Sequence, residues 1–177
     1  MNVVPEVSPA PSTKDCKPGR IWRFGDDVDT DAMAPGLYMK AGIDALAQHC
    51  LENLRPDFPG SVRHGDIVVA GGNFGMGSSR EQAPQALRHL GVAAVLASSF
   101  SGLFYRNAIN LGLPVLVCPH AEALADGARG TFDLATASVW LADGSSVACE
   151  PVPDFLRAML EAGGLVPHLK ARLKGGG

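Results

Sequence analysis

The sequence predicts an α/β domain built around a central, mostly parallel β-sheet. Three short apolar runs indicate buried strands, at residues 67–70, 92–97 and 114–118, and the first of them is rich in β-branched residues. The stretches between these runs, 82–90 and 103–111, have the character of amphipathic helices. Strands that alternate with helices in this order pair in parallel and are joined by right-handed crossovers.

Further elements are predicted on both sides of this unit. Residues 20–24 alternate basic and apolar side chains and indicate a first strand, and residues 43–54 have the apolar spacing of a helix. After residue 119 the sequence changes to short strand-like pieces around a hairpin signal, Asp143-Gly144, and then to a helix over 155–162. The strand-like pieces are residues 131–134, 138–141 and 146–149.

The chain has the length and composition of one domain. Its 177 residues are 46% hydrophobic, which is enough to bury a core, and no internal repeat or linker divides them. We predict a flexible tail at residues 1–18, which hold four prolines, and a single domain over 19–170. Residues 171–177, rich in glycine, are predicted to form a frayed C-terminal end.

Charge and hydropathy argue against several classes of partner. The net charge is −3 and no run of Lys or Arg is present, so neither nucleic acid nor a membrane surface is an expected partner. The longest apolar runs are too short to span a bilayer, and the N-terminus lacks the basic and apolar regions of a signal peptide. The four cysteines are widely scattered, without metal-ligand spacing. We therefore expect a cytoplasmic protein.

A glycine-rich stretch at residues 71–82 is the most informative part of the sequence. It follows a predicted strand and precedes a helix that begins near Gln82, so Ser78, Ser79 and Arg80 lie in the turn itself. The free N–H groups of a helix start attract anions, and a guanidinium matches a carboxylate or a phosphate. The turn is therefore a candidate anion site, and an ordinary serine-capped helix start fits the spacing equally well.

The spacing of this turn does not match the known phosphate-binding motifs. No lysine follows the last glycine, as a Walker A loop requires, and the glycines do not have the dinucleotide-binding spacing. Two capping boxes do fit the sequence, one pairing Ser78 with Glu81 and the other pairing Ser79 with Gln82.

An aspartate-rich loop over residues 25–36 is the second candidate. Asp27, Asp29 and Asp31 have the spacing that begins a calcium loop, but the sixth position is Ala32 instead of Gly and the twelfth is Tyr38 instead of Glu. We therefore reject an EF-hand. Clustered aspartates of this kind are more often solvent-exposed turn residues or helix caps.

Both stretches resemble characteristic motifs of the aconitase superfamily. The run Gly-Ser-Ser-Arg-Glu at 77–81, with Asn-Phe-Gly at 73–75 and Ala-Pro at 83–84, is similar to the signature of its swivelling domain. The run Asp-Thr-Asp at 29–31, with Pro35 and Tyr38, is similar to the other characteristic loop of that domain. The similarity extends over about residues 19–164, and the chain length resembles that of the separate small subunits of the two-chain members.

The resemblance implies a fold and a division of labour. The fold would be a three-layer β/β/α swivelling domain whose central sheet is mostly parallel. A large subunit, in a heterodimer or heterotetramer, would carry a [4Fe-4S] cluster, and this chain would bind none and would be inactive alone. The reaction would be the dehydration and rehydration of a hydroxy-di- or tricarboxylic acid, with isopropylmalate of leucine biosynthesis as the leading substrate.

The resemblance also implies roles for individual side chains. Ser78 would act as the base in its alkoxide form, and Asp31 would orient polar groups or water near the reacting hydroxyl. A serine is a weak base unless its alkoxide is strongly stabilised, which the helix-end N–H groups and the guanidinium could do. The substrate-binding residues would be Ser79, Arg80, Thr30 and Lys40.

Gln82 and the loop 36–40 do not determine which acid is the substrate. Gln82 stands where relatives commonly have His, so a proton relay through that position is not expected. In the loop 36–40, Met39 would suit an isopropyl group and Lys40 an extra carboxylate, although Lys40 fits a solvated surface lysine equally well. Homoaconitate, citraconate, maleate and dimethylmaleate-type acids are alternative substrates. A stand-alone anion-binding or regulatory module is the alternative from another class of function.

Overall fold

Seven strands form one sheet within residues 17–176, the part of the chain that the computed structural model describes, in the order β4-β3-β2-β1-β5-β6-β7. The first four strands along the chain pair in parallel. They are β1 (Gly19–Arg23), β2 (Ile67–Ala70), β3 (Ala94–Ala97) and β4 (Val115–Val117). The last three form an antiparallel meander that joins β1 through β5. They are β5 (Arg129–Asp133), β6 (Ser138–Leu141) and β7 (Ser146–Ala148).

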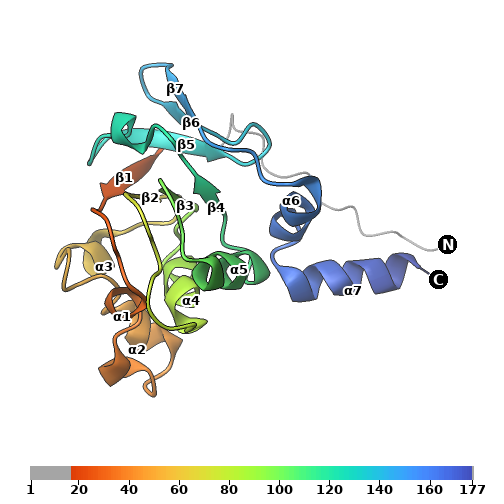
Figure 1. The fold of residues 1–177 in the computed structure, drawn as a ribbon, viewed down its shortest axis with the longest axis horizontal. Coiled ribbons are helices and arrows are strands. Elements are labelled where there is room, and N and C mark those ends of the chain that lie inside the picture. Colours follow the sequence, from red (N-terminus) through yellow and green to blue (C-terminus); the bar gives the residue numbers. More distant parts are fainter. Residues whose placement is uncertain (1–16, 177) are drawn as a thin grey trace.

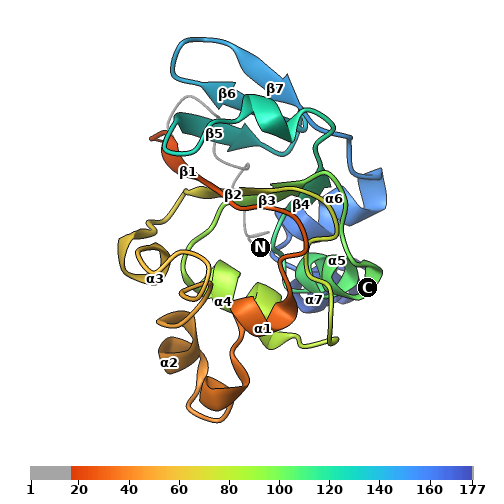
Figure 2. The ribbon, with the colours of Figure 1, turned by 60° about the vertical axis from the view of Figure 1, so that its left-hand side comes forward.

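The strands make two layers, and helices make the third (Figures 1 and 2). Because successive strand residues point to opposite faces, β2 and β3 contribute to two cores. Val68 and Val95 lie in the core under the helices, whereas Ile67, Val69 and Leu96 lie in the core between the parallel strands and the meander. The predicted three-layer β/β/α arrangement with a mostly parallel central sheet is confirmed.

Two helices form the crossovers that the strand–helix alternation predicted. α4 (Gln82–His89) connects β2 to β3, and α5 (Gly102–Asn110) connects β3 to β4. α4 begins at Gln82, as predicted, and buries Ala83, Ala86 and Leu87 against the sheet. The remaining helices are α1 (Thr30–Met33), α2 (Ile43–Ala47), α3 (Phe58–Ser61), α6 (Asp154–Glu161) and α7 (Leu165–Gly175).

The N-terminal half contains two corrections to the predicted elements. The helix predicted over 43–54 ends at Ala47, after which His49 and Cys50 donate to carbonyls only three residues back along the chain. The chain then turns at Leu51, whose φ is 59° and whose N–H donates to the carbonyl of Ala32. The loop predicted over 25–36 contains the short helix α1. Asp29 starts it, since its carboxylate accepts the N–H of Ala32 at 2.7 Å.

The C-terminal end also differs from the prediction. Gly163 and Gly164 follow α6 and both have positive φ. The turn that they form packs closely against the end of α5, since an added Cβ on Gly164 would overlap the Asn110 carbonyl oxygen. The chain then continues into α7, so residues 171–175, which were predicted to fray, are helical. Residues 1–16 of the predicted N-terminal tail lie outside the described part. None of the helices within residues 17–176 has the length and apolar character to cross a bilayer.

Replacing Leu96 tests the core between the two sheet layers. Leu96 is wholly buried there, so Leu96→Ala should lower the free energy of unfolding by about 2–5 kcal/mol through lost burial and a residual cavity. Leu173→Ala, on the exposed side of α7, should change it by less than about 0.5 kcal/mol. Urea unfolding followed by circular dichroism measures both. Equal losses in the two variants would contradict the assignment of Leu96 to a core.

Candidate active site

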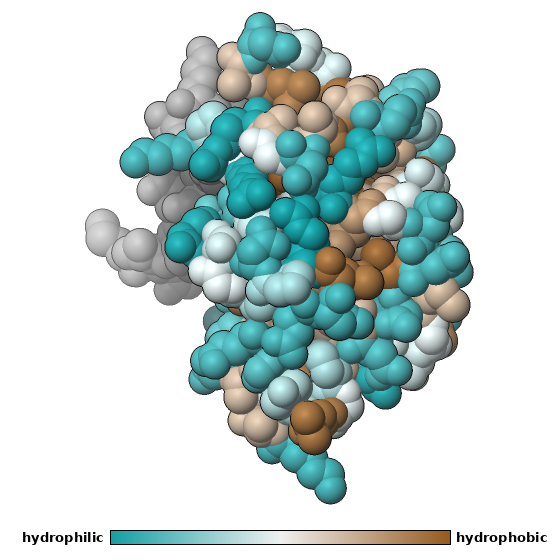
Figure 3. Space-filling model, turned by 90° about the vertical axis from the view of Figure 1, so that its left-hand side faces the viewer, coloured by the Kyte–Doolittle hydropathy of each residue, from teal (hydrophilic) through white to brown (hydrophobic). Residues whose placement is uncertain are grey.

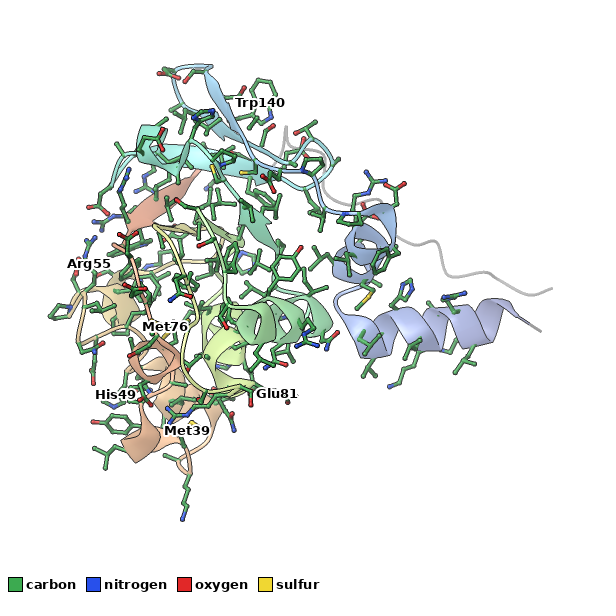
Figure 4. The ribbon with its side chains drawn as sticks, viewed as in Figure 1. Met39, His49, Arg55, Met76, Glu81 and Trp140 are labelled. Atoms are coloured by element: carbon green, nitrogen blue, oxygen red, sulfur yellow. The ribbon has the colours of Figure 1, made fainter. Side chains whose placement is uncertain are left out.

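The loops that follow β1 and β2 meet at one edge of the sheet. Because β1 and β2 are parallel neighbours, the loops that follow them start side by side at the carboxyl ends of the strands. Backbone hydrogen bonds then join the loops: Asp27 N–H donates to Gly72 at 2.9 Å, Gly75 N–H to Val28 at 2.7 Å, and Thr30 N–H to Met76 at 2.9 Å. Figure 4 shows Met76 beside α1. The aspartate-rich loop and the glycine-rich turn therefore form one unit.

The glycine-rich turn is also anchored to the loop after β3. Phe74 is fully buried, its N–H donates to the Ser99 carbonyl at 3.0 Å, and its ring packs edge-on against Phe104 with a centroid distance of 5.2 Å. Gly75 follows with a φ of 82°, and an added Cβ there would overlap the Phe104 ring. Glycine is therefore required at this position for both conformation and space.

Ser78 and Thr30 are in direct contact. The side-chain oxygens lie 3.1 Å apart, and the Thr30 hydroxyl oxygen also accepts the N–H of Ser78 at 3.2 Å. Thr30 is only 2% exposed, whereas Ser78 lies on the surface. Thr30 was predicted to bind substrate, and the structure places its hydroxyl against Ser78.

Arg80 lies on the other side of this turn and contacts α1. Its Nη1 donates to the Asp31 carboxylate and, at 3.1 Å, to the carbonyl of Ala34. The Arg80 side chain is 27% exposed and that of Asp31 is 68% exposed, so the ion pair lies at the surface. Both contacts use one guanidinium nitrogen, and an arginine has donors on two more.

Ser79 occupies the turn between these two residues, and its side chain is exposed. Its carbonyl accepts the Asn107 amide of α5 at 3.0 Å. The predicted capping boxes are wrong, because α4 starts after Glu81 with no side-chain cap hydrogen bond. Asn107 was not predicted from the sequence as part of this turn. No local pattern marks it, because only the packing of α5 beside α4 brings it to the turn.

The loop 36–40 lies next to α1 and α2. Tyr38, in a short 3₁₀ helix (Gly36–Tyr38), stacks on the His49 ring with a centroid distance of 3.5 Å, and His49 Nδ1 lies 2.9 Å from the Glu52 carboxylate oxygens. Lys40 is exposed at the tip of this loop. Figure 4 shows Met39 and Glu81 at the end of the domain far from Trp140. The structure thus brings four of the six predicted residues into contact as two pairs, Thr30 with Ser78 and Asp31 with Arg80. Ser79 and Lys40 are exposed.

The surface around the site is open and polar. The face over α1, α2 and α3 is mainly hydrophilic, with small separate apolar areas (Figure 3). Ser78 and Arg80 do not line three of the hollows in the described surface. One, of about 320 Å³, lies at Trp140, and another, of about 280 Å³, lies between α2 and α4. Ser78, Ser79 and Asp31 are exposed, so this part of the candidate site is open to solvent.

Comparison with known proteins identifies the family. The Aconitase C-terminal domain family matches residues 46–120. The homoaconitase small subunit of Methanothermobacter thermautotrophicus is 52% identical over 85% of this chain and 88% of its own length. The 3-isopropylmalate dehydratase small subunit 1 of Methanopyrus kandleri is 50% identical over 86% and 91%. The chain belongs to the family of 3-isopropylmalate dehydratase and homoaconitase small subunits.

The fold agrees with a solved structure of this family. A crystal structure described as 3-isopropylmalate dehydratase of Methanocaldococcus jannaschii superposes with a TM-score of 0.82 at 43% sequence identity. The match covers 88% of this chain and 94% of that one. The family and fold expected from the two motifs are therefore confirmed.

The cysteines of the described part do not form a metal site. Cys50 lies in the core under the helices, and Cys118 and Cys149 lie in the core between the two sheet layers. All three are free thiols, and burial raises the pKa of Cys50 well above its usual range. No group of three or more His, Cys, Asp or Glu side chains within residues 17–176 is arranged to hold a metal ion. This part of the chain does not fit a bound iron–sulfur cluster.

A substitution at Gly75 tests how the family's glycine-rich turn is built. Gly75→Ala should lower the free energy of unfolding by about 1–3 kcal/mol or more, because the methyl group strains a positive φ and overlaps Phe104. The matched control is Gly102→Ala, where an added Cβ meets no atom within 4 Å. Thermal unfolding of both variants measures the difference. A Gly75→Ala variant as stable as the control would contradict the close approach of the turn to α5.

Proposed function

We propose that this chain is the small subunit of a two-chain hydro-lyase that interconverts 2-isopropylmalate and 3-isopropylmalate by dehydration and rehydration. One observation carries the proposal: an exposed serine hydroxyl, Ser78, lies in the same turn as Arg80 and directly over α1. Removal of a carbon-bound proton from a dicarboxylic acid requires a base and a cationic partner for the carboxylates. Ser78 and Arg80 have these two chemistries.

Ser78 is the proposed base, acting as an alkoxide on the carbon-bound proton. An alkoxide forms only where fixed donors and positive charge favour it. The Arg80 guanidinium, two residues along the chain, supplies the charge, and the N–H groups at the start of α4 add a positive dipole end. During rehydration the same hydroxyl would return the proton to carbon.

Arg80 and Ser79 are the proposed carboxylate-binding residues. Arg80 uses Nη1 for Asp31 and Ala34, and its other two nitrogens can bind a substrate carboxylate together with the Ser79 hydroxyl. Asp31 keeps the guanidinium in place and, as an exposed carboxylate, can orient the water that leaves and returns.

The proposal places the iron–sulfur cluster on a separate large subunit. The thiols of the described part are buried in two different cores, which does not fit cluster ligation. A [4Fe-4S] cluster on the partner would supply a Lewis acid for the departing hydroxyl. The exposed position of Ser78 supports this arrangement, because a partner that covers it would separate the substrate from bulk solvent.

Homoaconitate is the second candidate substrate, and the loop 36–40 supports both. Leu37 is 84% exposed and Met39 is partly buried, and such apolar side chains suit an isopropyl group. Lys40 is exposed beside them and suits the additional carboxylate of a tricarboxylic acid. The 3-isopropylmalate dehydratase and homoaconitase small subunits compared above are 50% and 52% identical to the chain, so sequence identity does not distinguish the two candidate substrates.

Anaerobic reconstitution with the large iron–sulfur subunit of the same host tests the function. The panel of acids is 2-isopropylmalate, homoaconitate, citraconate and dimethylmaleate, assayed by ultraviolet absorbance of the unsaturated acid. We expect turnover of isopropylmalate by the complex and none by either chain alone, since each chain holds part of the site. A chain that binds these diacids alone, and never supports turnover with an active large subunit, would be an anion-binding module instead.

Ser78→Ala tests the assignment of the base. In the reconstituted complex kcat should fall by about 10²–10⁴-fold with KM nearly unchanged, because the substrate carboxylates keep their partners. The matched control, Ser146→Ala, removes an exposed hydroxyl on β7 and should leave both constants unchanged. A near-normal kcat for Ser78→Ala would remove this assignment while leaving the assembly itself intact.

A further inference from the structure

Thr30 has an environment that a substrate-binding residue would not need. Thr30 is 2% exposed, so it is covered by protein, and both of the hydrogen bonds described for its side chain are to Ser78. Added volume at Gly77 would come within 3.3 Å of the same hydroxyl oxygen, which shows how closely the turn surrounds it. Such a buried hydroxyl can form hydrogen bonds with Ser78, but it is poorly placed to contact a substrate.

The hydrogen-bond capacity of Thr30 determines what it does to Ser78. A threonine hydroxyl has one proton and two lone pairs, and one lone pair already accepts the Ser78 N–H at 3.2 Å. The hydroxyl proton is therefore available for the Ser78 oxygen 3.1 Å away. Either hydroxyl can donate while Ser78 is neutral. Once Ser78 is an alkoxide it can only accept, so Thr30 must then be the donor.

The backbone holds Thr30 in this orientation. Its N–H donates to the Met76 carbonyl at 2.9 Å, and Asp29 caps α1 immediately before it. Thr30 is also the first residue of α1, and its carbonyl accepts the N–H of Ala34 at 2.9 Å. The donor is therefore fixed before any charge develops on Ser78, and fixed donors stabilise charge without reorganisation.

We propose that Thr30 is a positioning residue for the base: it orients the Ser78 hydroxyl through two hydrogen bonds and donates to the Ser78 oxygen when that oxygen is deprotonated. This inference rests on the proposed function, in which Ser78 is the base. It replaces the predicted role of Thr30 as a substrate ligand. The distinction is measurable, because a positioning residue affects kcat and a substrate ligand affects KM.

Three variants in the reconstituted complex test the proposal. Thr30→Val keeps the shape and removes the hydroxyl, so kcat should fall at least about tenfold, with KM changed by less than about twofold. Thr30→Ser restores the hydroxyl and should recover kcat to within about threefold of the unmodified chain. The matched control is Thr136→Val, which removes one hydroxyl hydrogen bond, to Asp133 at 3.0 Å, in the remote β5–β6 turn and should change neither constant.

A double-mutant cycle separates an effect through Ser78 from a general loss of structure. In the Ser78→Ala background, adding Thr30→Val should not reduce the residual rate further, because the residue through which Thr30 acts is absent. A further loss of about tenfold in that background would overturn the proposal. A raised KM with unchanged kcat, or unchanged constants in Thr30→Val, would overturn it as well.

Amide hydrogen exchange in the full chain tests the geometry without activity. The Ser78 N–H should exchange about tenfold faster in Thr30→Val than in Thr30→Ser, because only the second variant retains its acceptor. Equal exchange rates would overturn the proposal whatever the kinetics. An unmodified complex that turns over none of the acids would instead refute the proposed function, and the exchange experiment would still decide whether Thr30 positions Ser78.

Discussion

The backbone hydrogen bonds between the loops after β1 and β2 are the constraint on which the candidate site depends. They join the carbonyls of Gly72, Val28 and Met76 to N–H groups of the opposite loop at 2.7–2.9 Å. Because these bonds use only main-chain atoms, they set the distance between the loops independently of the side chains that face the solvent. Thr30 and Ser78 then meet as a consequence of this spacing.

The two cores give this edge a firm support. Residues of β2 and β3 alternate between the core under the helices and the core under the meander, so both strands are buried on both faces. The loops at their carboxyl ends therefore start from positions that cannot shift without disturbing two packed layers. Phe74 also anchors the glycine-rich turn, because its N–H bonds to the loop after β3 and its ring packs against Phe104.

The chemistry of the site also explains why the proposed enzyme needs two chains. This chain presents the exposed Ser78 hydroxyl, held by the buried Thr30, and the partly exposed Arg80 guanidinium, held by the Asp31 carboxylate. A proton can be removed from carbon with such groups, but a hydroxyl group leaves easily only when a Lewis acid binds it. The proposed large subunit would supply that acid and would cover the exposed side chains of Ser78 and Arg80.

The sequence by itself determined the elements and the motifs, because each depends on neighbouring residues. The apolar runs predicted β2, β3 and β4, and the glycines together with Gln82 predicted a turn followed by α4. Local rules failed where a distant residue competed. The predicted capping boxes did not form, and the helix predicted over 43–54 ended at Ala47, before the turn in which Leu51 donates to Ala32.

Only the tertiary structure decided which side chains meet. Thr30 and Ser78 are 48 residues apart, and Asp31 and Arg80 are 49 apart. Both contacts require β1 to lie beside β2 in the observed register and the turn to pass through the positive φ of Gly75 and Gly77. Neither condition is encoded in a short stretch of sequence, because strand order and register follow from the packing of the whole sheet. The sequence therefore identified the candidate residues, and the sheet determined their partners.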